Sequence, residues 1–301
     1  MTKPDNRPFG GVLCPLVTPF RDGAIAYDDL EALVEHVLDG GVTGLVPCGT
    51  TGEFASLGDD EYRAVIETTV ECADGAPVMA GTAHTSVEGT LDRVSFAADA
   101  GADAALVTLP YFHTANDPAG NEAFVSAVAD DAPLPIYLYN IPACTGQEIP
   151  PSVVEAVADR DSIAGLKDSG GDFNYFGELV RRTPDSFQLF QGFDSHLVPA
   201  LVFGGTGGIN ALSNVVPEVF AAAYEAATDG DVEAARRIHR RAIAPLFQQC
   251  VAHGFAPATK AGLLARDVIS SDAVRPPLVE LDGDATADVA ASVDAALAAR
   301  E

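Results

Sequence analysis

The sequence predicts an α/β protein, a (β/α)8 TIM barrel followed by a C-terminal helical extension. Eight short apolar runs alternate with amphipathic segments along the 301 residues, which is the rhythm of repeated strand–helix units. The length suits a single large barrel. No glycine-rich nucleotide-binding fingerprint follows the first apolar run, and this disfavours an open doubly wound sheet.

The candidate strands are the apolar runs themselves. Each is a few residues long, and helical or loop-forming segments separate it from the next. They lie at Val12–Thr18, Gly44–Cys48, Pro77–Gly81, Ala104–Leu109, Pro135–Tyr139, Ile163–Lys167, Phe187–Gln191 and Gly207–Asn210.

Helical patterns fill the intervals and the region beyond the last strand. The clearest between strands are Asp28–Leu38, Asp59–Cys72, Val87–Ala100 and Ser152–Ala158. After the last strand, helices are predicted at Pro217–Thr228, which would close the barrel, and at Val232–Ala252, Pro257–Arg266 and Asp284–Ala299. No linker interrupts this region. Residues 1–230 are therefore expected to form the catalytic barrel, and residues 231–301 a helical extension of the same domain.

The chain carries a formal net charge of −27, from 44 acidic and 17 basic side chains. Such a surface repels nucleic-acid phosphates and anionic membranes, so neither is an expected partner. The acidic residues are dispersed rather than gathered in a tail, which favours a halophilic protein. No apolar run is long enough for a membrane helix and the N-terminus lacks a signal-peptide core, so a cytoplasmic location is expected.

Five cysteines and six histidines are widely spaced along the chain. They form no pair or cluster with the spacing of a zinc site or of a disulfide framework. The sequence therefore predicts reduced thiols, most of them in the core, and no metal site.

In a (β/α)8 barrel, functional side chains gather where the strands end and the following loops begin. Four such places carry reactive or polar residues: Gly49–Glu53, Tyr111, Tyr139–Asn140 and Lys167–Ser169. A lysine, two tyrosines and two threonines are thus expected to meet at one mouth of the barrel.

Lys167 is one of only three lysines, and it ends a strand whose preceding residues are apolar. An ammonium group that loses its hydration favours the neutral amine, which can attack a carbonyl group. The alternative is a purely structural ion pair with Asp168 or with another carboxylate at the barrel rim. Position alone leaves both open.

Tyr139 is a candidate acid–base group, because a phenol can pass a proton when a hydroxyl relay supports it. Thr50 could supply the relay and Tyr111 could extend it. The turn that contains Gly49 and Thr51 could bind a carboxylate through hydroxyl and backbone N–H donors. The alternatives are tyrosines that only cover the core and a turn that only reverses the chain.

The sequence resembles the dihydrodipicolinate synthase / N-acetylneuraminate lyase superfamily over roughly residues 10–280. The matching motifs occur in the order and spacing of that family. They are Gly49–Glu53, Pro110–Phe112, Tyr137–Pro142, Thr145-Gly146, Gly165–Asp168, Gly192–Asp194 and Gly207–Ile209.

The resemblance implies a role for each residue of the predicted mouth. Lys167 would form a Schiff base with the C2 carbonyl of pyruvate or of another 2-oxo acid. Tyr139 would move protons, linked through Thr50 to Tyr111, which in the family comes from the neighbouring subunit of a tight dimer. The substrate would be held by the remaining site residues, which are Gly49, Thr51, Cys144, Gly192 and Ile209, the last through its carbonyl oxygen.

The resemblance also implies a homo-oligomer, a dimer of dimers, that uses no metal or organic cofactor because the protonated imine accepts the electrons. Dihydrodipicolinate synthases usually carry an arginine in the loop after the fifth strand, where it binds the carboxylate of aspartate semialdehyde. Cys144 stands at that position here, and a thiol cannot replace a bidentate guanidinium.

The expected reaction is therefore reversible cleavage of a 2-keto-3-deoxy sugar acid, such as 2-keto-3-deoxygluconate or its 6-phosphate, to pyruvate and an aldehyde. The motif around Cys144 and the Arg275-Pro276-Pro277 segment are similar to aldolases of this branch. Three alternatives remain open. They are a 4-hydroxy-tetrahydrodipicolinate synthase, a dehydratase of 2-keto-3-deoxy acids, and a 2-oxo acid sensor without catalysis.

Overall fold

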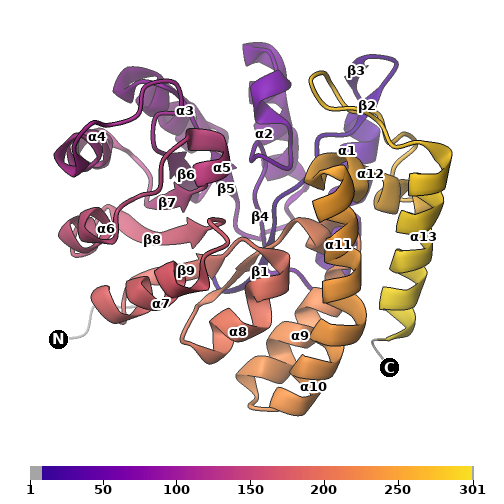
Figure 1. The fold of residues 1–301 in the computed structure, drawn as a ribbon. Coiled ribbons are helices and arrows are strands. Elements are labelled where there is room, and N and C mark those ends of the chain that lie inside the picture. Colours follow the sequence, from indigo (N-terminus) through magenta and orange to yellow (C-terminus); the bar gives the residue numbers. More distant parts are fainter. Residues whose placement is uncertain (1–8, 300–301) are drawn as a thin grey trace.

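The computed structural model describes residues 9–299 and shows eight parallel strands that close into a barrel (Figure 1). The strands run in the order β4-β1-β10-β9-β8-β7-β6-β5. A bridge between Leu45 and Val78 brings the two ends of this order together. The strands are β1 (Gly11–Cys14), β4 (Gly44–Leu45), β5 (Met79–Gly81), β6 (Ala104–Thr108), β7 (Ile136–Asn140), β8 (Ile163–Asp168), β9 (Gln188–Gln191) and β10 (Gly207–Ile209).

Helices connect successive strands and form the outer layer of the barrel (Figure 1). Two short strands, β2 (Phe20–Arg21) and β3 (Ala24–Ile25), form an antiparallel hairpin before the first helix. The helices of the outer layer are α1 (Tyr27–Asp39), α2 (Asp59–Cys72), α3 (Val87–Ala100), α4 (Pro118–Asp131), α6 (Pro151–Val157), α7 (Phe173–Arg182), α8 (Leu197–Val202) and α9 (Pro217–Thr228). The short helix α5 (Pro142–Thr145) follows β7 at the mouth of the barrel.

The helical extension follows α9 and packs on one side of the barrel, next to the β2–β3 hairpin (Figure 1). A π-helical segment, His239–Ile243, joins its first two helices, so the predicted helix Val232–Ala252 is continuous but not regular. The helices are α10 (Val232–Ile238), α11 (Ala244–His253), α12 (Phe255–Ala265) and α13 (Gly283–Ala298).

Apolar side chains fill two layers. Inside the barrel, residues from several strands form one cluster, which includes Leu13, Met79, Tyr137 and Phe190. Between the barrel and the helices, the alternate residues of the same strands pack outward, as Leu138 and Leu166 do. This alternation follows from the two-residue period of a strand, and it directs every second side chain toward the barrel axis.

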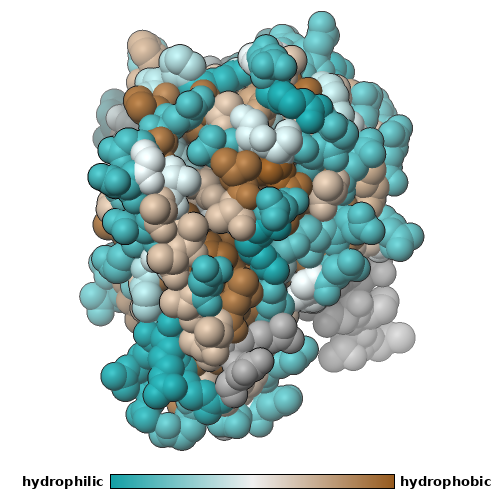
Figure 2. Space-filling view, turned by 90° about the vertical axis from the view of Figure 1, so that its right-hand side faces the viewer, coloured by the Kyte–Doolittle hydropathy of each residue, from teal (hydrophilic) through white to brown (hydrophobic). Residues whose placement is uncertain are grey.

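Hydrophilic residues surround a central band of apolar ones on the face that carries α13 (Figure 2). Helix α13 on this face is rich in alanine, and its buried side includes Val289 and Val293. None of the helices within residues 9–299 is long and apolar enough to cross a membrane.

Candidate active site

Tyr139 and Lys167 stand side by side at the mouth of the barrel. They are register partners on the neighbouring parallel strands β7 and β8, so their side chains project to the same face. That face is the barrel interior, where Lys167 is 4% exposed and Tyr139 is 6% exposed. The ammonium nitrogen of Lys167 lies 4.3 Å from the centre of the Tyr139 ring, a cation–π distance.

The surroundings of Lys167 leave its amine free of a structural ion pair. Asp168 directs its carboxylate to the side chain of Asn140 and to the backbone N–H of Gly170, at 2.8 and 2.9 Å. Within the described part of the chain, no carboxylate forms an ion pair with Lys167. Gly192 makes room for it, because a β-carbon there would lie 2.9 Å from the Lys167 Cε atom. The ion-pair alternative is therefore wrong for these residues.

A tight turn after β4 carries the two threonines. It begins and ends at non-glycine residues in the left-handed region, Cys48 with φ 57° and Glu53 with φ 54°. Such residues cost about 1 kcal/mol or more each, and they persist only where the surrounding structure holds them. The Thr18 hydroxyl donates to the Gly52 carbonyl at 2.7 Å. The turn is thus a strained but fixed unit that presents Thr51, which is 8% exposed, to the barrel mouth.

The first two members of the predicted hydroxyl relay lie next to each other. The Thr50 hydroxyl and the Tyr139 phenol oxygen lie 3.5 Å apart, the outer limit of a hydrogen bond. Catalytic hydrogen bonds are often long before substrate binds. Tyr111, the proposed next member, is 40% exposed and makes no hydrogen bond to Thr50 within the described residues.

A cavity of about 270 Å³ opens over Lys167. Seven of the predicted site residues line it, namely Thr50, Thr51, Tyr139, Cys144, Lys167, Gly192 and Ile209. Gly49 does not line it but belongs to the threonine turn, where its carbonyl accepts from the Phe54 N–H at 3.4 Å. Tyr111 lines an adjoining cavity of about 360 Å³, which shares Thr50, Ile141, Cys144 and Leu278 with the first.

The helical extension contributes to the cavity wall, which the sequence did not predict. Phe255, Ala256 and Pro257 at the start of α12 and Leu278 beyond its end all line the cavity. The similarity of Arg275-Pro276-Pro277 to one branch of the family was a signal for this segment, because Leu278 follows it directly. The extension therefore completes the cavity wall through these four residues rather than only adding to the barrel.

Among residues 9–299, Lys167 is the only charged side chain that lines the first cavity. The other walls are largely apolar, and they include Ala143, Phe193 and Phe255. Such a cavity offers one amino group to one carboxylate or carbonyl group of a ligand. The apolar walls strengthen the electrostatic interactions of that amino group. Within residues 9–299, no three His, Cys, Asp or Glu side chains lie close enough together to hold a metal ion.

Asp194, whose carboxylate interacts electrostatically with Lys167, is completely buried, and the sequence predicts no role for it. One carboxylate oxygen accepts from the Leu212 N–H at 2.7 Å, and the other has no hydrogen-bond partner within the described residues. Burial raises the pKa of Asp194 from 3.8 to about 6, although backbone N–H groups and Lys167 oppose this increase. The carboxylate is therefore ionised at neutral pH at an energetic cost.

This raised pKa predicts a pH-dependent stability that Asp194→Asn should remove. The folded protein holds the Asp194 proton more tightly than the unfolded chain, so the stabilisation is present below about pH 4 and is lost as the pH rises through about 6. The shift corresponds to about 3 kcal/mol. Relative to wild type, the variant should therefore gain up to about 3 kcal/mol of unfolding free energy between pH 4 and 7.

Urea unfolding of both proteins across this range measures the difference. Asparagine also loses or gains hydrogen bonds, but that offset does not change with pH, so only the slope is diagnostic. A constant difference between the two proteins from pH 4 to 7 would contradict the prediction.

Comparisons with known proteins agree with this geometry. A model of the dihydrodipicolinate synthetase family matches residues 8–296. The 4-hydroxy-tetrahydrodipicolinate synthase of Hyphomonas neptunium is 38% identical over 294 residues, covering 96% of this chain and 98% of that protein. The enzyme of the same name from Methanosarcina acetivorans is 38% identical over 242 residues, covering 80% of this chain and 82% of the relative.

Solved structures give the same result. The dihydrodipicolinate synthase of Thermotoga maritima superposes with a TM-score of 0.92 at 28% identity, covering 96% of this chain and 99% of that one. YagE, an E. coli prophage protein of the same family solved in complex with pyruvate, superposes with a TM-score of 0.91 at 30% identity and the same coverage. The fold, the mouth of the barrel and these similarities together show that the chain belongs to the dihydrodipicolinate synthetase family.

Proposed function

We propose that this enzyme makes or breaks a carbon–carbon bond at the methyl carbon of pyruvate through an imine on Lys167. The observation that carries the proposal is a buried lysine that lines a cavity, lies 4.3 Å from the Tyr139 ring and has no carboxylate partner within residues 9–299. The neutral amine attacks the C2 carbonyl, and Tyr139 protonates the hydroxyl group that leaves as water. The Tyr139 phenolate left by that step takes a proton from C3 of the protonated imine, the resulting enamine attacks an aldehyde carbonyl, and the aldehyde oxygen takes the proton back from Tyr139.

The threonine turn supports the pyruvate carboxylate in this proposal. The Thr51 hydroxyl and the backbone N–H groups beside Gly49 supply donors for the carboxylate, which lies within reach of the Lys167 imine. Ile209 also lines the cavity, and in this proposal its backbone carbonyl faces the reacting centre, while Gly192 keeps the space beside the lysine open. The reaction needs no metal or organic cofactor, because the protonated imine is the electron acceptor.

Aspartate semialdehyde is the first candidate for the second substrate. The curated relatives that match at 34–38% identity carry the name 4-hydroxy-tetrahydrodipicolinate synthase. Their names favour condensation of pyruvate with this aldehyde over the sugar-acid cleavage that the motif around Cys144 predicts. The chain therefore has the family chemistry, and its relatives favour the synthase reaction.

A sugar-acid aldolase is the second candidate, and one observation favours it. Aspartate semialdehyde carries a second carboxylate, but among residues 9–299 no arginine lines either cavity, and Lys167 is the only lysine that does. Cys144 stands where the family usually has that arginine. A hydroxylated aldehyde without a carboxylate would need no such clamp.

One substrate panel separates these candidates. The synthase reading predicts that pyruvate plus aspartate semialdehyde reacts with a kcat/KM at least about a hundredfold above that for pyruvate release from 2-keto-3-deoxygluconate. The panel also includes the 6-phosphate, keto-deoxypentonates and N-acetylneuraminate. The reverse preference would establish the aldolase, loss of water without pyruvate release would indicate the dehydratase, and no turnover of any member would overturn the proposal in favour of a sensor.

The proposed enzyme acts as a homo-oligomer, with a dimer of dimers as the expected form. Tyr111 and Phe112 form an exposed aromatic pair beside the second cavity, at 40% and 81% exposure. Adjacent exposed aromatic side chains are typical of subunit contacts. In this arrangement Tyr111 of one subunit would extend the hydroxyl relay of its neighbour.

A further inference from the structure

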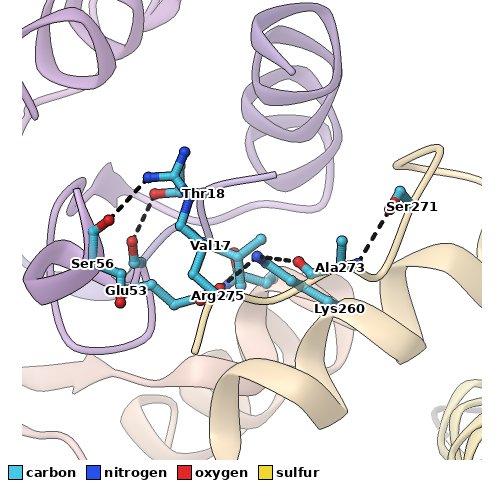
Figure 3. Close-up of polar contacts among 10 residues, drawn as sticks. Val17, Thr18, Glu53, Ser56, Lys260, Ser271, Ala273 and Arg275 are labelled. Atoms are coloured by element: carbon cyan, nitrogen blue, oxygen red, sulfur yellow. Dashed lines mark hydrogen bonds and ion pairs between the residues drawn. The ribbon is translucent and has the colours of Figure 1, made fainter. Parts of the chain in front are cut away.

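A second buried lysine contacts the last residue of the threonine turn, Glu53. Lys260, on α12, is 0% exposed, and its ammonium group donates to a Glu53 carboxylate oxygen at 2.5 Å and to the Ala273 carbonyl at 2.8 Å (Figure 3). Burial lowers the pKa of Lys260, and Glu53 opposes that change. The ion pair connects residues that are 207 positions apart, one from the barrel and one from the extension.

Arg275 completes the surroundings of Glu53. Its backbone N–H donates to the second Glu53 oxygen at 2.9 Å, so both oxygens of that carboxylate are bound from the extension. Its guanidinium group makes two bonds of 2.6 Å to Glu61 and one of 2.9 Å to the Ser56 carbonyl. Lys260 and Arg275 both lie over the ring of Phe20, at 4.1 and 4.3 Å from its centre.

This network holds one end of the strained threonine turn. Glu53 has a left-handed backbone, and its N–H donates to the Thr50 carbonyl at 3.1 Å. At the adjacent residue, the Gly52 carbonyl accepts from Thr18. The turn has no comparable side-chain anchor within its own sequence. Its conformation is therefore held from outside, by the Thr18 hydroxyl at Gly52 and by the groups that bind the Glu53 carboxylate.

A buried ion pair is a weak source of stability, because hydrophobic residues of similar volume often replace one without loss. A pair that fixes the position of a nearby functional group has a further reason to be retained. The Lys260–Glu53 pair meets that condition, since Thr50 and Thr51 precede Glu53 by three and two residues and both line the cavity over Lys167.

We propose that Lys260, together with Arg275, is a positioning residue for pyruvate binding. Through Glu53 it fixes the turn whose Thr51 hydroxyl and backbone N–H groups bind the pyruvate carboxylate. The extension thereby contributes to the site in two ways. It holds the threonine turn through Glu53, and it supplies Leu278, three residues beyond Arg275, to the walls of both cavities. This inference rests on the proposed pyruvate-imine function and adds residues to it.

The test compares wild type with Glu53→Gln and with the double variant Lys260→Met/Glu53→Gln. The single variant is isosteric but leaves an unpaired buried ammonium, whereas the double variant removes both charges and keeps the volumes close to wild type. The matched control is Arg266→Met/Glu218→Gln, which removes another ion pair between the extension and the barrel, at 2.9 Å and away from the cavity. Thermal melting first establishes the folded fraction of each protein.

The measured quantity is the pyruvate concentration that half-saturates borohydride trapping on Lys167, together with kcat and both KM values. We expect the pyruvate KM and the trapping constant of the double variant to rise about tenfold, with kcat changed less than about threefold. The aldehyde KM and all parameters of the control should stay near wild type. Simple loss of folded protein lowers kcat and leaves KM unchanged. A raised pyruvate KM with a nearly unchanged kcat therefore distinguishes a positioning role from a loss of stability.

A folded Glu53→Gln or double variant with a wild-type pyruvate KM would overturn the inference, and so would a variant whose only change is fewer active sites. Failure of both variants to fold would also overturn it, because the pair would then be structural. If wild type itself gave no pyruvate adduct, the proposed function would fail instead, so the two failures are distinguishable.

Discussion

Lys167→Ala is expected to abolish turnover, with a loss on the order of 10⁴-fold or more in kcat/KM, because the whole imine route depends on one amine. Removing the side chain should leave the fold intact, since no ion pair within residues 9–299 depends on it. Lys167→Arg is the matched variant, because it keeps the positive charge but cannot form the imine. Both variants should therefore be equally inactive.

Borohydride reduction with pyruvate, followed by peptide mass mapping, checks this result directly. Wild type should gain one pyruvate-derived mass on the peptide that contains Lys167, and both variants should gain none. The chain holds only two other lysines, Lys3 and Lys260. Lys260 serves as an internal control, because its ammonium is buried in an ion pair. Substantial activity in Lys167→Arg would mean that the lysine acts by charge, and a wild-type adduct on either other lysine would place the imine elsewhere.

The barrel was predictable from the sequence because its signal is repeated eight times. All eight predicted strands are present, and their ends differ for local reasons. The first strand was predicted to run to Thr18, but it ends at Cys14 because Pro15 has no N–H to continue the ladder. The second ends at Leu45, just before another proline at 47. Apolar patterning therefore located the strands, and prolines explain why these two strands are shorter than predicted.

The residues at the mouth of the barrel were predictable from the topology of the predicted fold. Tyr139 and Lys167 each end a strand, and the topology of a parallel barrel brings strand ends together. The part that patterning could not supply is long-range contact between the barrel and the extension. Nothing in the local sequence pairs Glu53 with Lys260 or places Leu278 beside Cys144, because such contacts depend on how α12 packs after the barrel has closed.

The choice of aldehyde substrate depends on the residues around Cys144, for which two arguments disagree. Cys144 argued for sugar acids from the sequence, whereas the names of the relatives argue for aspartate semialdehyde. Both arguments concern the choice of aldehyde, and neither affects the proposed imine on Lys167. The chemistry and the choice of aldehyde are thus separable, and they need separate experiments.

Tyr139→Phe is expected to lower kcat by about 10²–10⁴-fold, the range for loss of a positioned acid–base group. The substitution keeps the aromatic ring that lies 4.3 Å from the Lys167 ammonium and removes only the phenol oxygen. Pyruvate should therefore still bind, and borohydride should still trap some imine. Proton transfer during dehydration and during carbon–carbon bond formation should become slow.

Thr50→Val tests the relay behind the phenol, because valine keeps the shape of threonine and removes its hydroxyl. Since the Thr50 and Tyr139 oxygens lie 3.5 Å apart, a relay predicts a loss for Thr50→Val smaller than that for Tyr139→Phe. The two losses should not add in the double variant, because once the phenol is gone the threonine has no proton to pass on. Steady-state kcat in the three variants and single-turnover trapping rates measure this coupling. Additive losses would mean that Thr50 and Tyr139 act independently, and an unimpaired Tyr139→Phe enzyme would require the proton to come from water or from another side chain of the cavity.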